Sequence, residues 1–327
     1  MNKALRYFSF FVSFSVLLLI LKGALVTSHD AGLSVPDWPT SYGDNMFLFP
    51  PSKWTGTIFY EHVHRLLASF VGAMTLILTI WILIAEKRKW VKVLSVFALV
   101  AVILQGILGG VTVLYQLPAA VSSAHAVLAQ TFFIITIILA YSQSAECERR
   151  SQSSAAPDTS AQFSLCLSFL IAIFMQLVIG AFMRHTYAGI AVPDFPTMGG
   201  SYFPSFDESF LSNINQQRKA LHMAPVDYLQ IAVHLLHRLF AVLVFLAFLP
   251  FAGSVYKDLK QEEFWLKRAR TLTAFLGFLI LLQITLGIIT LISVREPWVA
   301  SFHVMFGALL LGMTALTAIR LYKPRLN

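Results

Sequence analysis

The stretch EHVHRLLA, residues 61–68, stands where a polar segment gives way to a long apolar run. Glu61 and His64 are three residues apart, so on a helix their side chains share one face. Arg65 follows at the boundary between polar and apolar sequence. A carboxylate, an imidazole and a guanidinium are thus placed together at the start of an apolar helix, which predicts a site at the edge of a membrane.

The pattern returns once, as VHLLHRLFA at residues 233–241, again at the start of an apolar run. The second copy keeps the His–Arg pair as His237 and Arg238, but it has His234 where the first copy has Glu61. Two related sites are expected, and only one of them has the carboxylate.

Composition defines the class of protein. Of the 327 residues 57% are hydrophobic and only 12% are charged, and the mean hydropathy is +0.72; a soluble domain carries about a quarter charged residues. Apolar runs near 20 residues predict α-helical membrane spans. The net charge of +8 suits cytoplasmic loops better than a nucleic-acid partner. The two cysteines, Cys147 and Cys166, predict neither a structural disulfide nor a metal motif.

Eight spans are expected in an all-α integral membrane protein. They cover about 8–27, 61–84, 91–113, 121–142, 163–183, 228–250, 271–292 and 298–321. The first is too long for a signal peptide and lacks a small-residue cleavage site, so an uncleaved helix is expected.

The chain is interpreted as two tandem four-helix bundles. The segment Pro36–Pro39 is echoed at Pro193–Pro196, and His125 in span four is echoed by His303 in span eight. The predicted domains are an N-terminal half at 1–145, a cytoplasmic linker at 146–162 and a C-terminal half at 163–327. Because each half has an even number of spans, the repeat is parallel. Most of the 24 Lys and Arg lie in the terminal segments and in the loops between spans 2–3, 4–5 and 6–7, so both termini are expected in the cytoplasm.

Four histidines are candidate metal ligands: His64, His125, His237 and His303. A lone histidine in a span often only packs against a neighbouring helix. Four at one depth, about one turn inside the outer surface and in two repeat-related pairs, favour ligation. Paired imidazoles without cysteine fit haem held between helices, whereas zinc usually needs three or four converging ligands.

The neighbouring polar residues each have two interpretations. Arg65 and Arg238 are expected to pair with haem propionates, or else to reach lipid phosphate. Glu61 is expected to act in the chemistry, or else to be a solvated boundary residue. His234 is interpreted mainly as a packing residue, with a proton relay as the alternative. His62 points away from the Glu61 face and is expected at the membrane interface.

The loops contribute further candidates. His29, His185 and His222 are expected to be solvated or to form hydrogen-bond networks. The two Pro-Asp-aromatic-Pro segments are interpreted as rigid turns, which either cap the sites or serve only as turns.

Taken together, these residues resemble the haem A synthase family over essentially the whole chain. The resemblance rests on Glu61-x-x-His64-Arg65, on residues 32–39, on His125, and on three residues of the second half, which are His237, Arg238 and His303.

The resemblance implies oxidation of the C8 methyl group of haem O to a formyl group, giving haem A for cytochrome oxidase. It implies that His64 and His125 hold the substrate haem, that His237 and His303 hold haem b, and that Glu61 is required for the chemistry. Some members carry a cysteine pair in the first outer loop; residues 28–60 contain none.

The expected function is therefore a haem-modifying oxidoreductase of the bacterial plasma (inner) membrane, with haem b as cofactor. Its expected partners are haem O, haem O synthase, the assembly of cytochrome oxidase, membrane lipid and an electron acceptor that the sequence does not identify. A di-haem b-type cytochrome without substrate haem is the alternative, and a haem carrier without redox chemistry is a third reading.

Overall fold

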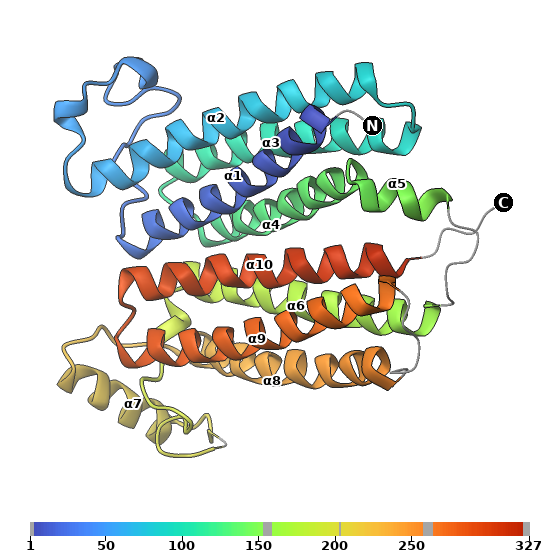
Figure 1. The fold of residues 1–327 in the computed structure, drawn as a ribbon. Coiled ribbons are helices and arrows are strands. Elements are labelled where there is room, and N and C mark those ends of the chain that lie inside the picture. Colours follow the sequence, from blue (N-terminus) through green and yellow to red (C-terminus); the bar gives the residue numbers. More distant parts are fainter. Residues whose placement is uncertain (1–2, 153–158, 203, 258–263, 323–327) are drawn as a thin grey trace.

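The structure, a computed structural model, describes residues 3–152, 159–202, 204–257 and 264–322 (Figure 1). Its α-helices are α1 (Lys3–Ser28), α2 (Gly56–Ala85), α3 (Lys89–Leu114), α4 (Ala119–Ser142), α5 (Ala145–Gln152), α6 (Ser160–His185), α7 (Glu208–Ala220), α8 (Tyr228–Lys257), α9 (Phe264–Ile292) and α10 (Pro297–Leu321). Short 3-10 helices are η1 (Met46–Leu48), η2 (Pro51–Lys53) and η3 (Ala188–Ile190). The all-α prediction is confirmed.

Eight helices are long and apolar enough to span a membrane: α1, α2, α3, α4, α6, α8, α9 and α10. These are the eight predicted spans, and the protein is an integral membrane protein. Several helices extend beyond their apolar runs, because backbone hydrogen bonding continues until a turn stops it. Helix α2 begins at Gly56 rather than at 61, so the Glu61 motif lies inside the helix and not at its end.

Two helices fall in segments that were expected to be irregular. Helix α5 lies in the predicted linker. Helix α7 lies in the second outer loop and begins where the Asp207 side chain accepts a hydrogen bond from the backbone N–H of Phe210, which is an N-cap. Both are short and polar, and neither has the apolar run by which the spans were identified.

The long helices pack as two groups. Helices α1 to α4 contact one another in sequence and close through α1 and α4, and helices α6, α8, α9 and α10 do the same through α6 and α10. The groups meet where α10 lies against α1 and α4, and where α4 lies against α6 (Figure 1). The assignment of the two groups as repeats, and their domain boundaries, remain predictions.

Helix α10 lies at the centre of this interface and is the most buried of the spans. Its contact face carries small residues, including Ala308, Gly312 and Ala315. A Cβ atom at Gly312 would lie 2.4 Å from Ile137 and 2.8 Å from Phe133 of α4. Small residues let helix backbones approach closely in a membrane, and this contact brings the two groups together.

The two ends of the molecule differ. Helix α5 and the start of α1 lie at one end, and α7 and the long loops lie at the other (Figure 1). At the α5 end, the Glu146 carboxylate lies 2.7 Å from Nε of Arg320 and also pairs with Arg268. The four candidate histidines lie toward the loop end. Which end faces the cytoplasm remains the prediction drawn from loop charge.

Candidate functional site

The four candidate histidines lie within the first three turns of α2, α4, α8 and α10. Each imidazole packs on a glycine of a neighbouring helix. A Cβ atom would lie 3.0 Å from Cε1 of His64 at Gly23, 3.5 Å from His125 at Gly109, 3.1 Å from His237 at Gly180 and 3.3 Å from His303 at Gly287. A glycine on the neighbouring helix therefore provides the space in which each ring lies.

The histidines are close enough to interact in pairs. His64 interacts electrostatically with His125, and His237 with His303. The Nδ1 atom of each of the four rings is buried without a hydrogen-bond partner within the described residues. A histidine that served only packing would be expected to use its buried polar atoms. The four rings therefore have unused capacity that fits metal ligation.

Glutamine side chains tie the histidine-bearing helices to their neighbours. Gln105 Nε2 donates to the carbonyl of His125 at 2.9 Å, and Gln176 Nε2 donates to the carbonyl of His237 at 3.1 Å. The Gln176 amide also lies 3.2 Å from Nε2 of His237, so a ligand at that nitrogen would have to displace it. The sequence gives no signal for the role of Gln176, because only the folded helices bring it beside His237.

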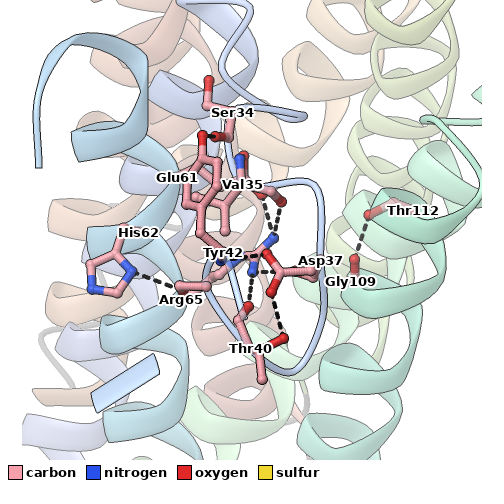
Figure 2. A network of polar contacts seen from close by, with 11 residues as sticks. Ser34, Val35, Asp37, Thr40, Tyr42, Glu61, His62, Arg65, Gly109 and Thr112 are labelled. Carbon is pink, nitrogen blue, oxygen red and sulfur yellow. Dashed lines mark hydrogen bonds and ion pairs between the residues drawn. The ribbon is translucent and has the colours of Figure 1, made fainter. Parts of the chain in front are cut away.

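Arg65 binds the first outer loop. Its Nη2 donates to the carbonyl of Val35 at 2.6 Å, and its Nη1 donates to the carbonyls of Asp37 and Thr40 at 2.7 and 3.0 Å (Figure 2). Both Nη atoms are thus used by the protein. The expected pairing of Arg65 with a haem propionate stays a prediction, and these contacts give the side chain a different partner.

Arg238 makes the equivalent contacts in the second half. Its guanidinium donates to the carbonyls of Val192, Asp194 and Thr197 at 3.3, 2.8 and 2.8 Å. In each half an arginine on the histidine helix therefore fixes the loop above the site. The propionate role expected for Arg238 is likewise not what its contacts show, and it remains a prediction.

The two Pro-Asp-aromatic-Pro segments form turns around the aspartate. The Asp37 carboxylate accepts from Thr40 Oγ1 at 2.5 Å and from the N–H groups of Tyr42 and Gly43 at 2.7 and 2.9 Å. Partial burial raises the pKa of Asp37, but the hydrogen bonds from Gly43, Thr40 and Tyr42 outweigh it, and the pKa lies below its ordinary value. Asp194 accepts equivalent bonds from Thr197, Gly199 and Gly200.

Glu61 is 3% exposed and is held between the loop and the arginine. Its Oε2 accepts from the N–H of Val35 at 2.9 Å, and its Oε1 pairs with Nη2 of Arg65 at 2.6 Å. The alternative of a solvated boundary carboxylate is wrong, because the loop folds over Glu61, and the chemical role stays a prediction. The structure engages both oxygens with the loop and Arg65, not with His64.

His234 occupies the corresponding place in the second half. Its Nδ1 lies 3.4 Å from the N–H of Val192, and its Nε2 accepts from Nε of Arg238 at 3.0 Å. A neutral imidazole has a single acceptor nitrogen, so the ring accepts a bond from Arg238 and only lies beside the Val192 N–H, whereas both oxygens of Glu61 accept bonds. The residue has a structural role in holding the loop, which is more specific than the packing role expected from sequence.

His62 was expected at the membrane interface, and this was wrong. Its side chain is fully buried under the first loop, 3.2 Å from Oγ of Ser41 and stacked obliquely against Phe49 and Trp54. The first loop covers this side of α2, so His62 becomes buried although it points away from the bundle.

Among the loop histidines, His29 stacks on Tyr60 with ring centroids 3.8 Å apart.

Trp38 distinguishes the two halves. Its indole lies over Gly110 of α3, where a Cβ atom would come within 2.5 Å of the ring, one residue after the glycine beneath His125. The two aromatic residues are similarly exposed, Trp38 at 41% and Phe195 at 48%, but Phe195 lies under the Arg238 guanidinium instead of over a helix glycine. The first loop therefore reaches into its bundle beside the histidine pair.

The sequence matches the cytochrome oxidase assembly protein family over residues 6–315. It is 28% identical over 322 residues to a protein of Shewanella oneidensis named "Heme A synthase", which is 92% of this chain and 91% of that protein. It is also 30% identical over 210 residues to the protein of the same name from Alkalihalophilus pseudofirmus, which is 62% of this chain and 67% of that protein. The chain also carries two pairs of candidate histidines. Because the family match spans nearly its whole length, the chain belongs to the family of cytochrome oxidase assembly proteins.

Proposed function

We propose that this protein is a haem A synthase, a membrane oxidoreductase that converts the C8 methyl group of haem O to a formyl group. The proposal is supported by the family match, by the relatives named "Heme A synthase" and by eight apolar helices. The product would serve cytochrome oxidase assembly, as the family description suggests. Haem O synthase is the proposed supplier of the substrate.

The two histidine pairs are the proposed haem sites. His64 and His125 would hold the substrate haem in the N-terminal half, and His237 and His303 would hold haem b in the C-terminal half. The unused Nδ1 atoms, the glycine under each ring and the electrostatic pairing support ligation of both groups. Haem b, when bound, supplies a one-electron redox centre.

One observation distinguishes the proposed catalytic half. Glu61 and His234 lie against the corresponding loop valine and arginine of their own halves, and the second loop is held without a carboxylate. Holding the loop therefore does not require a carboxylate, and the buried charge of Glu61 calls for another reason. A buried ion pair is often no more stable than an apolar replacement. We infer that Glu61 is present for chemistry at the substrate haem.

The role of each neighbour follows from its contacts. Arg65 supplies the counter-charge that keeps the Glu61 carboxylate in place, and Val35 fixes the second oxygen. From this position Glu61 would accept a proton, or stabilise positive charge, as the methyl group is oxidised. The Asp37 turn and Trp38 close the loop over the site and limit the access of water.

The test replaces Glu61 with the residue that the second half carries. Glu61→His is expected to keep the loop in place through a bond with Arg65, as His234 does with Arg238 in its own half, and to remove the carboxylate. Loss of a positioned acid or base costs about 10²–10⁴-fold in rate. Glu61→His should therefore retain both haems and make little haem A, measured by haem extraction and mass analysis.

Glu61→Gln is the companion variant, since it keeps shape without basicity and should fail in the same way. Haem A formation at the normal rate in both variants would refute a chemical role for Glu61. The same extraction tests the alternative of an electron-transfer cytochrome. Two equivalents of haem b per wild-type protein, with neither haem O nor haem A, would favour that alternative.

A further inference from the structure

Arg184 lies at the loop end of α6, where the two helix groups meet. Its Nη2 donates to the carbonyl of Ala24 at 2.5 Å and to Oγ of Ser28 at 2.7 Å, both on α1. Ser28 continues the chain of bonds to Oγ of Ser301 on α10 at 2.9 Å. The guanidinium is thus fixed by three helices that belong to both groups.

The acceptors that hold Arg184 are neutral. Among the described residues, the carboxylate that acts on the Arg184 charge is that of Asp30, and both of its oxygens are bound by Arg295, at 3.1 and 2.8 Å. Two arginines therefore share one aspartate, which leaves one positive charge in excess. Arg184 is partly buried, and a partly desolvated cation without a carboxylate of its own favours an anion beside it.

The unused donors of Arg184 are available for that anion. Among the described residues, its Nε and Nη1 make no hydrogen bond or ion pair. By contrast, both Nη atoms of Arg65 and both Nη atoms of Arg238 donate hydrogen bonds to loop carbonyls. Of these three arginines, Arg184 is the one that retains a free Nη.

The position of Arg184 indicates which site it serves. Ser28, which Arg184 binds, is bonded to Ser301, two residues before His303 on α10, and Arg184 follows Gly180, the glycine under the His237 ring, by one turn of α6. The equivalent position in the first half, at the same spacing from the glycine under the histidine ring, is Thr27, which bonds only its own helix at Gly23. The cation therefore belongs to the second site alone.

We propose that Arg184 binds a propionate carboxylate of the haem held by His237 and His303, and so raises the reduction potential of that haem. The inference rests on the proposed haem b site. Because Nη2 is used by Ala24 and Ser28, a carboxylate oxygen would accept a single charge-assisted hydrogen bond, from Nη1 or from Nε. A positive charge beside the haem favours the reduced form, which carries one positive charge fewer.

The experiment is a potentiometric titration of the purified holoprotein in maltoside detergent, followed at the absorption bands of haem b. Arg184→Gln should shift the ratio of reduced to oxidised haem about tenfold toward the oxidised form at a given potential, about 59 mV for one electron. Arg184→Lys keeps the charge and should remain close to wild type. If the shift in the haem b midpoint persists after lipid is removed, the anion that Arg184 binds belongs to the haem and is not a lipid phosphate.

Two controls separate charge from structure. Ser28→Ala removes a bond that holds Arg184 but no charge, so its midpoint should match wild type. Lys22→Gln removes a cation that interacts with His64 of the first site, and it should also leave haem b unchanged. If Arg184→Gln does not assemble, Ser28→Asp places an anion against the guanidinium and should lower the midpoint in its place.

The inference is wrong if Arg184→Gln, or Ser28→Asp in its place, keeps the wild-type midpoint. It is also wrong if Ser28→Ala shifts the midpoint as far as Arg184→Gln does. Failure of the proposed function looks different, because wild-type protein would then yield neither haem O nor haem A on extraction, whatever the midpoint of haem b.

Discussion

Replacement of Gly23 by alanine tests whether the space under each histidine is essential. The new Cβ atom would lie 3.0 Å from Cε1 of His64, whereas carbon atoms in contact are normally about 3.5–4.0 Å apart. The ring or the helix must therefore move by about 0.5 Å or more. Ligand distances at a metal site are held to about 0.2 Å, so we expect ligation by His64 to suffer.

The cost follows from the packing. Forcing an added carbon into a filled space typically costs about 1–3 kcal/mol, which is about 5- to 150-fold in haem affinity. Gly109→Ala is the matched control in the same site, because its Cβ would meet His125 at an ordinary 3.5 Å. Both substitutions place alanine within a helix and gain similar helix propensity, about 1 kcal/mol.

The assay is the ratio of haem O to haem b in purified protein, with haem b of the second site as internal standard. Gly23→Ala should lower this ratio at least about fivefold, and Gly109→Ala should leave it near the parent value. Equal ratios in the parent and in both variants would refute the argument that His64 ligates the substrate haem from the position seen here.

Three further predictions follow from the sites and the loops. Reporter fusions near residue 90 should be cytoplasmic and fusions near 205 external, and the reverse result would overturn the placement of the histidines at the outer face. Replacing His237 or His303 by alanine should remove or shift the low-spin haem b spectrum, and an unaltered spectrum in both would exclude them as ligands. Hydrogen bonding by the Arg88 side chain outweighs burial and lowers the pKa of Glu86 to about 2. The ionised Glu86 carboxylate therefore stabilises the fold fully at pH values above 4.5, its ordinary pKa, and this stabilisation is lost as the pH falls toward 2. The difference in melting temperature between wild type and Glu86→Gln should therefore narrow over that interval, and a difference that does not change with pH would contradict the assignment.

The spans and the candidate ligands could be predicted from the sequence for a physical reason. A bilayer admits only helices of about 20 apolar residues in a chain of this composition, so the runs alone placed all eight. Polar side chains are costly in such runs, and His64, His125, His237 and His303 therefore stood out. The repeated His–Arg pair and the two Pro-Asp segments identified the residues around the proposed sites.

The partners of these residues were decided only by the tertiary structure. Glu61 and His234 lie at equivalent positions, but nothing in the sequence shows that each bonds a valine N–H some 26 or 42 residues earlier in the chain. Arg65 and Arg238 were expected to pair with haem propionates or lipid phosphate, which stays a prediction, and the structure adds that both hold the loops. Such contacts join segments that are distant in sequence, so residue spacing carries no information about them.

Arg184 shows the same limit most clearly. In the sequence it is one basic residue at the end of a span, where lipid phosphate is the usual partner. Its importance comes from α1 and α10, which bring neutral acceptors to one edge of the guanidinium and leave Asp30 to Arg295. The sequence by itself determined which helices cross the membrane and which residue types they carry. Only the packing of one helix group against the other decided where the uncompensated charge lies. The physical reason is that electrostatic compensation depends on distances between charges, and the order of residues does not specify those distances.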